Sequence, residues 1–177
     1  MEFPKIVLLC IAAAIVYGII HDQFTARICI EYFTVFHPAV FATKSPTLLA
    51  LGWGVIATWW MGALLGMLLA IAARSGSRPK LSAAMLIEPI GKLLAVMAGC
   101  ALAAGFAGFV LAEQGLVSPP LWVSHRLSPA VEARFMADWW AHNASYAVGF
   151  LGGIALCAVQ FRKRAKSLRG CPGWGIG

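Results

Sequence analysis

Charged residues are scarce in this sequence. They make up 12% of its 177 residues, whereas apolar residues make up 60%. A soluble globular chain carries about 25% charged residues, which it needs to coat its surface with water-binding groups. A surface that faces lipid must do without them. The scarcity of charge therefore excludes an ordinary soluble domain and predicts an integral membrane protein.

Several cysteine and histidine motifs are also absent. The five cysteines are odd in number and form no CxxC, and at least three fall in apolar segments. This excludes a disulfide framework and favours buried thiols that act as small apolar residues. The lack of CxxCH excludes covalent haem, and the lack of HExxH removes the commonest close-spaced zinc motif.

The net charge of +7 could suggest a nucleic-acid partner. The basic residues, however, gather beside the ends of apolar segments, where positive charge sets membrane orientation and meets anionic headgroups. No polar stretch alternates aromatic and basic residues as single-strand binders do. The predicted partner is therefore the lipid bilayer and not a nucleic acid.

Four apolar segments predict four membrane-spanning helices, over about residues 4–21, 47–73, 90–112 and 138–161. The first is expected to be retained, because no small-x-small cleavage site follows it. The second is a run of 27 residues without a charge. Pro89 is expected to confine residues 82–91 to an interfacial turn before the third span. Ser128 and Pro129 predict the start of a long fourth helix.

The expected fold is an all-α polytopic membrane protein, a four-transmembrane-helix bundle over residues 1–165 with interfacial helical segments on the extracytoplasmic side. Residues 166–177 are expected to form a disordered cytoplasmic tail. A homo-oligomer or a larger membrane complex is compatible with this fold. Small residues four apart in each span predict close helix packing: Ala14 and Gly18, Gly62 and Gly66, Ala104 and Gly108, and Gly149 and Gly153.

Orientation follows from the distribution of lysine and arginine. With four spans, ten of these residues fall on the side of the termini and four on the other. Because positive residues are enriched in cytoplasmic loops, both termini are predicted to be cytoplasmic. All four histidines and five of the seven acidic residues then lie at or near the extracytoplasmic side.

The first outer segment, residues 21–46, holds polar residues at helical spacing. If it is helical, Gln23, Arg27, Glu31 and Thr34 share one face, and Arg27 can pair with Glu31. The alternative is an interfacial helix whose polar face has no further role.

The start of the fourth span places Asp138 and His142 four residues apart, on one side of a helix. Such a pair can supply two metal ligands, or the carboxylate can orient the imidazole. His21 ends the first span at a similar depth. The predicted metal site therefore combines His21, Asp22, Glu31, Asp138 and His142, a nitrogen and oxygen set suited to zinc, copper or iron.

Two other interpretations of these residues stay open. They can form a hydrogen-bonded structural cluster without a cofactor, or two histidines can ligate a non-covalent haem. Glu88 and Lys92 are expected to form a structural pair near the cytoplasmic end of a span. The span centres lack ionisable groups, which argues against a transporter.

Three stretches carry a family resemblance: residues 16–38, residues 53–60 and Trp140-Ala141-His142-Asn143-Ala144-Ser145-Tyr146. Together they resemble an uncharacterised family of small bacterial four-helix inner-membrane proteins. The resemblance extends to about Phe161. It implies a bacterial inner membrane as the location and implies no activity.

The sequence thus predicts a small membrane protein that binds a metal or similar cofactor at an extracytoplasmic polar cluster, for redox or hydrolytic chemistry. Whether it is an enzyme is left open. The alternatives are a non-enzymatic accessory or scaffold subunit and, third, a small-molecule permease.

Overall fold

The computed structural model describes residues 1–169 of the chain, with side chains up to residue 165. Within this range the secondary structure is entirely helical and turn, so the predicted all-α fold is confirmed. The elements in order are α1 (Glu2–Ile28), the π-helix η1 (Tyr32–Phe36), α2 (Pro46–Ile56), α3 (Trp59–Arg74), α4 (Ala84–Glu113), α5 (Leu121–Ser124), the 3-10 turn η2 (Pro129–Val131) and α6 (Glu132–Arg169).

Four helical stretches are long and apolar enough to cross a membrane: α1, α2 with α3, α4, and residues 129–165. The shortest has 27 residues. At 1.5 Å per residue it is about 40 Å long, whereas the hydrocarbon core of a bilayer is about 30 Å thick. The helices therefore project beyond the hydrocarbon, which is why they exceed the spans predicted from hydropathy.

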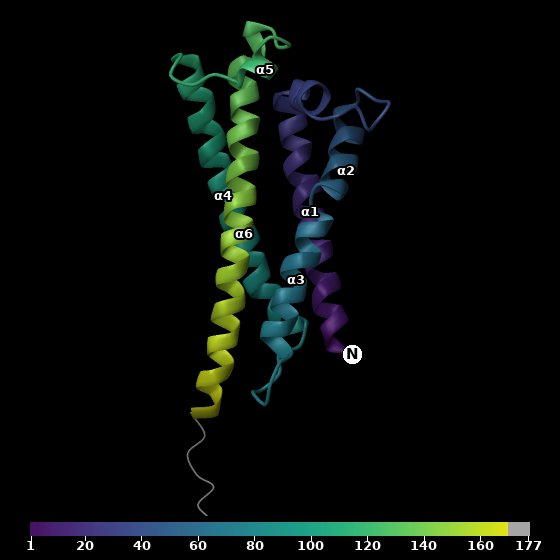
Figure 1. The fold of residues 1–177 in the computed structure, drawn as a ribbon, viewed down its shortest axis with the longest axis vertical. Coiled ribbons are helices and arrows are strands. Elements are labelled where there is room, and N and C mark those ends of the chain that lie inside the picture. Colours follow the sequence, from purple (N-terminus) through teal and green to yellow (C-terminus); the bar gives the residue numbers. More distant parts are fainter. Residues whose placement is uncertain (170–177) are drawn as a thin grey trace, which may run out of the picture.

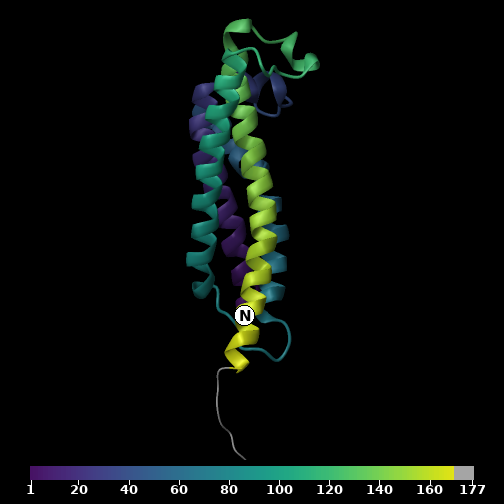
Figure 2. The same cartoon turned by 90° about the vertical axis from the view of Figure 1, so that its left-hand side faces the viewer.

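The four spans are arranged as two pairs (Figure 1). One pair consists of α1 against α2 and α3, and the other of α4 against α6. Contacts between α3 and α6 join the pairs, with smaller contributions from α1 against α4 and α6. Figure 2 shows all four spans running along one long axis. We call the end with η1 and α5 the histidine end, and the opposite end, with the N-terminus, the terminal end.

Within each pair, small residues let the backbones approach closely, as predicted. A Cβ atom on Gly62 would lie 2.8 Å from the carbonyl oxygen of Cys10, and one on Gly54 would lie 2.6 Å from the Cα atom of Ile19. In the other pair, a Cβ on Gly108 would lie 2.7 Å from the carbonyl oxygen of Met136. Such spacing gives the dispersion contacts that hold helices together in lipid, where no hydrophobic force does so.

The second span is broken, contrary to the prediction of one continuous helix over residues 47–73. The break falls at Ala57 and Thr58, between α2 and α3. The Thr58 hydroxyl donates a hydrogen bond of 2.5 Å to the carbonyl oxygen of Gly54. The Thr58 N–H donates to the carbonyl oxygen of Val55, three residues earlier. A threonine that bonds back to the residue four positions earlier bends a helix in this way.

The interfacial turn predicted at Pro89 is also wrong, because α4 runs through this residue. Proline removes one helical hydrogen bond, to the carbonyl four residues earlier. That carbonyl belongs to Met85, which is the second residue of the helix and is exposed. The lost bond therefore falls near a helix end, where solvent can replace it. The predicted Glu88–Lys92 pair is formed, with 2.5 Å between its charged atoms.

Short helices at the histidine end agree with the predicted interfacial segments. There η1 follows α1, α5 precedes the fourth span, and η2 begins at Pro129 as expected. Ser128 stands at the N-cap without a side-chain cap bond. At the far end α6 continues to Arg169, so residues 166–169 of the predicted disordered tail are helical. Residues 170–177 lie outside the described part.

Arg164 of α6 binds the connection between α3 and α4 at the terminal end. It is one of the ten basic residues counted on the side of the termini, and it is only 2% exposed. Its guanidinium donates hydrogen bonds to carbonyl oxygens of the last turn of α3 and of the connection between α3 and α4. Because arginine has five donors in a rigid fork, one side chain can satisfy several backbone acceptors at once. The acceptors belong to Ala72, Ser75, Arg78 and Pro79.

The close approach of α1 and α2 gives a testable expectation for Gly54→Ala. The added methyl must displace the backbone of α1 at Ile19, so we expect the free energy of unfolding to fall by about 1–3 kcal/mol. Thermal unfolding in mild detergent measures the change. The control is Gly99→Ala on α4, where a Cβ meets no atom within 4 Å. Equal stability of the two variants would contradict the crossing described here.

Candidate metal centre

The structure brings together three of the five residues predicted to form the site. His21 and Asp22 lie in the last two turns of α1, and His142 faces them from α6. One possible ligand atom from each residue lies within 4.8 Å of the other two. Asp22 and His142 are only 5% and 7% exposed, so these two residues are shielded from solvent.

His142 is held in a single orientation. Its Nδ1 lies 2.7 Å from the carbonyl oxygen of Asp138, one turn earlier in α6. The Tyr32 ring stacks on the imidazole, with ring centroids 4.4 Å apart. Because a carbonyl can only accept, Nδ1 donates the hydrogen, and Nε2 of the neutral ring carries a free lone pair. Metal-ligating histidines show this arrangement, with the second nitrogen bonded to a carbonyl or carboxylate.

The lone pair of His142 points at another acceptor. Nε2 lies 3.2 Å from Oδ1 of Asp22. Two acceptors at this distance repel each other unless a positive charge lies between or on them. A proton on the imidazole meets this requirement and gives an ion pair, and a metal ion bound to both atoms also meets it.

His21 favours the second of these two cases. Its Nε2 atom is buried and has no hydrogen-bond partner. The ring contacts His142 edge to face, with centroids 4.6 Å apart. An ion pair between Asp22 and His142 leaves this nitrogen unsatisfied, at a cost of about 1–3 kcal/mol. A shared metal ion satisfies all three residues.

Asp138 lies beside this group without joining it. Its carboxylate is fully buried, and neither oxygen has a hydrogen-bond partner. The predicted alternative in which the Asp138 carboxylate orients His142 is wrong, because the backbone carbonyl of Asp138 does so instead. A bare carboxylate in such surroundings is costly, so this group requires a proton or a nearby cation.

Glu31, the fifth predicted residue, lies outside the group. Its carboxylate accepts a hydrogen bond of 3.4 Å from the Cys29 thiol. The expected pairing with Arg27 is not formed; Arg27 instead donates to Gln23 and Thr47. The reason is that α1 ends at Ile28 and Cys29 is extended, with φ −144° and ψ 97°. Residues four apart share a face only in a continuous helix.

The other two histidines do not contribute ligands. His37 bonds to the carbonyl oxygen of Tyr32 and packs against Trp53, and burial lowers its pKa. His125 is exposed on the turn after α5. Burial also raises the pKa of the Cys29 thiol to about 12, which disfavours the reactive thiolate.

Sequence reasoning missed the polar groups one turn further into the membrane. The Tyr17 hydroxyl and Ser145 Oγ form a hydrogen bond of 2.8 Å between α1 and α6. Tyr17 precedes His21 by four residues, and Ser145 follows His142 by three. The helical spacing from the two histidines was the available signal, because residues three or four apart lie on one face.

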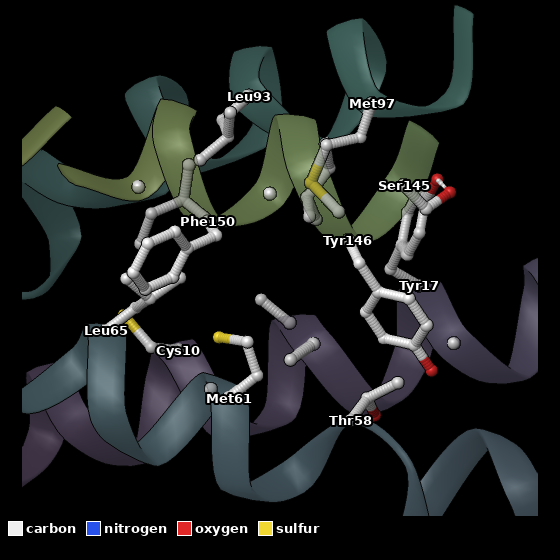
Figure 3. A pocket seen from close by; sticks show the side chains of 18 of the residues that line it. Cys10, Tyr17, Thr58, Met61, Leu65, Leu93, Met97, Ser145, Tyr146 and Phe150 are labelled. Atoms are coloured by element: carbon white, nitrogen blue, oxygen red, sulfur yellow. Dashed lines mark hydrogen bonds between the residues drawn. The ribbon is translucent and has the colours of Figure 1, made fainter. Parts of the chain in front are cut away.

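A cavity of about 120 Å³ continues from the three residues toward the terminal end, between the two helix pairs. Tyr17, Thr58, Ser145 and Tyr146 lie at one end of it, as Figure 3 shows. The rest of the lining is apolar, with Leu65, Leu93 and Phe150 among its side chains. The cavity is therefore polar only next to the histidines.

No protein-family model matches this chain, and no curated protein or solved structure matches it either.

The donor set fits a transition metal. Two imidazole nitrogens and one carboxylate oxygen match zinc sites that keep a position for water and the two-histidine, one-carboxylate sites of iron. Ligands about 2.0–2.2 Å from one ion lie closer together than 4.8 Å, so the side chains must close by roughly 1 Å. A haem does not fit between the histidines, because their rings are in contact.

Proposed function

We propose that this chain is a membrane protein that binds a divalent transition metal at its histidine end, through His21 Nε2, Asp22 and His142 Nε2. The observation that carries the proposal is the buried Nε2 of His21, which has no partner in the protein, on a ring that offers a ligand nitrogen within 4.8 Å of ligand atoms of Asp22 and His142. The hydrogen bond from His142 to the Asp138 carbonyl supports it, because it frees the other nitrogen for a ligand.

Zinc and iron suit this donor set best. Copper also prefers imidazole ligands. Because a haem does not fit between the two histidines, a single metal ion is the favoured cofactor. Three protein ligands leave at least one position for water or another molecule, as in catalytic rather than structural sites. A bound ion there would supply Lewis-acid chemistry, or redox chemistry if it is iron or copper.

We propose a bacterial inner membrane as the location, with both termini in the cytoplasm and the metal site near the extracytoplasmic face. The orientation is supported by the ten lysines and arginines on the terminal side against four on the other. The bacterial location is supported by the family resemblance of residues 16–38, 53–60 and 140–146.

A scaffold or accessory subunit is the second candidate. It is favoured by the Asp22–His142 contact, which joins the two helix pairs even as a simple ion pair. A permease for polar solutes is disfavoured, because such a path needs polar groups along its length and this cavity is apolar beyond its histidine end.

The metal content of protein purified in mild detergent without chelator tests the proposal. We expect about one zinc or iron ion per chain by elemental mass spectrometry. The His21→Ala/His142→Ala double variant is expected to lose it, and Asp22→Asn to weaken binding at least tenfold, since changes to outer-shell partners already cost 10–100-fold.

His125→Ala is the matched control, since it removes an exposed histidine at the same end. It should keep the metal of the wild type. Each variant is compared by size-exclusion profile and unfolding temperature, so that misfolding is recognised. A well-folded wild type that stays metal-free after reconstitution with zinc and with ferrous iron would contradict the proposal and favour the scaffold.

Orientation is tested by labelling of introduced cysteines in intact cells, on a chain whose own five cysteines are replaced by alanine. Lys44 and Ser77 are both exposed, in connections at opposite ends of the bundle. We expect a membrane-impermeant maleimide to label Lys44→Cys in intact cells and Ser77→Cys only after the cells are opened. The reverse pattern would place the metal site in the cytoplasm.

A further inference from the structure

The cavity beside the three residues is small. Its volume of about 120 Å³ lies below the range of about 300–1,000 Å³ that is usual for small-molecule pockets. It also lies below the roughly 150 Å³ of an apolar cavity that takes one benzene molecule. A water molecule takes up about 30 Å³ of the liquid. The cavity therefore excludes an organic substrate and a lipid chain, and it admits a molecule of only a few atoms.

Most of this space offers water no hydrogen bond. A buried water molecule needs about two to four polar partners, and apolar cavities stay dry for that reason. Beyond the histidine end the lining side chains are apolar, with Leu93 and Phe150 among them (Figure 3). Nearer the histidines, the hydroxyls of Tyr17 and Ser145 bond to each other, and that of Thr58 bonds to a backbone carbonyl. The occupant that suits this space is small, uncharged and apolar.

Aromatic rings of η1 cover the three residues on the other side. The ring of Tyr32 stacks on His142 with centroids 4.4 Å apart, and Phe33 meets the same imidazole edge to face at 5.9 Å. Tyr32 and Phe33 are 5% and 2% exposed, so they shield this side from solvent. The cavity, in contrast, is lined by His21, Asp22 and His142 themselves. A ligand of the site therefore approaches it through the cavity.

The cavity lies beneath the outer surface of the spans. Tyr146 and Phe150 line it and are still 41% and 40% exposed, so they reach from the cavity to the surface that faces lipid. Transfer of apolar molecules from water into an apolar phase is favourable, so apolar gases are enriched in the bilayer. The flexible side chain of Met61, which extends into the same space in Figure 3, can move to admit them.

The neighbouring metal site selects among such gases. Three protein ligands leave at least one coordination position open. Two histidines and one carboxylate with open positions are the ligand set of ferrous iron in non-haem oxygenases, whose substrate is dioxygen. Zinc has no redox chemistry and does not bind this gas. Dioxygen is therefore the molecule that suits both the cavity and an open position on iron.

We propose that the cavity holds dioxygen from the bilayer next to a ferrous ion bound by His21, Asp22 and His142, and that the gas binds at the open position of this ion. This inference rests on the proposed metal site. It adds which of the candidate metals acts there, which ligand that metal takes and how the ligand arrives. Binding adds a neutral molecule to the open position; no bond breaks, and no external electron or proton is consumed.

Methionine-methyl NMR tests the cavity without any metal. Dioxygen is paramagnetic, so it speeds the relaxation of nuclei that lie near it. The probe is the Met97 methyl group, which lines the cavity, in isotope-labelled, metal-free protein in mild detergent under dioxygen. We expect Met61→Trp, which fills the cavity from α3, to lower the added relaxation of this methyl at least twofold. Leu93→Phe fills the cavity from α4 in case the first variant does not fold.

Met67→Trp is the matched control, because it makes the same substitution on the exposed face of α3. It should leave the relaxation of the Met97 methyl as in wild type. This control separates gas held in the cavity from gas dissolved in the detergent around the helices.

Nitric oxide tests the iron, since it is a diatomic probe that gives ferrous sites a characteristic high-spin EPR signal. Wild type loaded with ferrous iron without air is expected to show this signal from its bound iron. Met61→Trp is expected to bind nitric oxide at least tenfold more slowly while its iron content stays the same, and Met67→Trp is expected to match wild type.

Metal content measured on the same samples separates the inference from the proposed function. Relaxation of the Met97 methyl that is equal in wild type and in both cavity-filling variants overturns the gas-holding cavity and leaves the metal site standing. Iron-loaded protein without a nitrosyl signal, or protein that takes up zinc but no ferrous iron, also overturns the inference alone. Well-folded protein that takes up neither metal overturns both.

Discussion

The meeting of α1 and α6 at the histidine end is the interaction on which the site and the cavity depend. Within a bilayer no hydrophobic force draws two helix pairs together, because lipid chains are as apolar as the helix surfaces. Polar groups buried from water have to find one another instead. Asp22 meets His142, and Tyr17 meets Ser145 one turn below. These contacts join the pairs at one end and leave the apolar space between them further along.

The same contacts explain why the candidate site is rigid. His142 is fixed by a backbone carbonyl on one nitrogen and by the Tyr32 ring on its face, so its other nitrogen has one direction available. The π-helix that carries Tyr32 lies directly after α1 and therefore packs over the histidines. A metal ion bound here would link α1 to α6 as well as perform chemistry. The Asp22–His142 contact thus belongs to both candidate functions, and the bound metal is what separates them.

Those features that depend on composition and helical period could be predicted from the sequence. They include the four spans, the crossing at small residues and the approach of His21, Asp22 and His142, since each follows from hydropathy or from helix ends at equal depth. Features that depend on local geometry could not. Glu31 leaves the site because Cys29 ends α1, and the second span breaks because Thr58 bonds to Gly54. Neither event changes the hydropathy pattern.

X-ray absorption at the zinc edge of the metal-loaded protein tests the central claim most directly, because it reports the ligands and not only the presence of metal. The account predicts two imidazole nitrogens and at least one further light atom at about 2.0–2.2 Å, with no sulfur. His21→Ala should lose one imidazole from this shell while His125→Ala leaves it unchanged. A shell with sulfur at about 2.3 Å, or one that is the same in the His21→Ala protein, would contradict the assignment of the site.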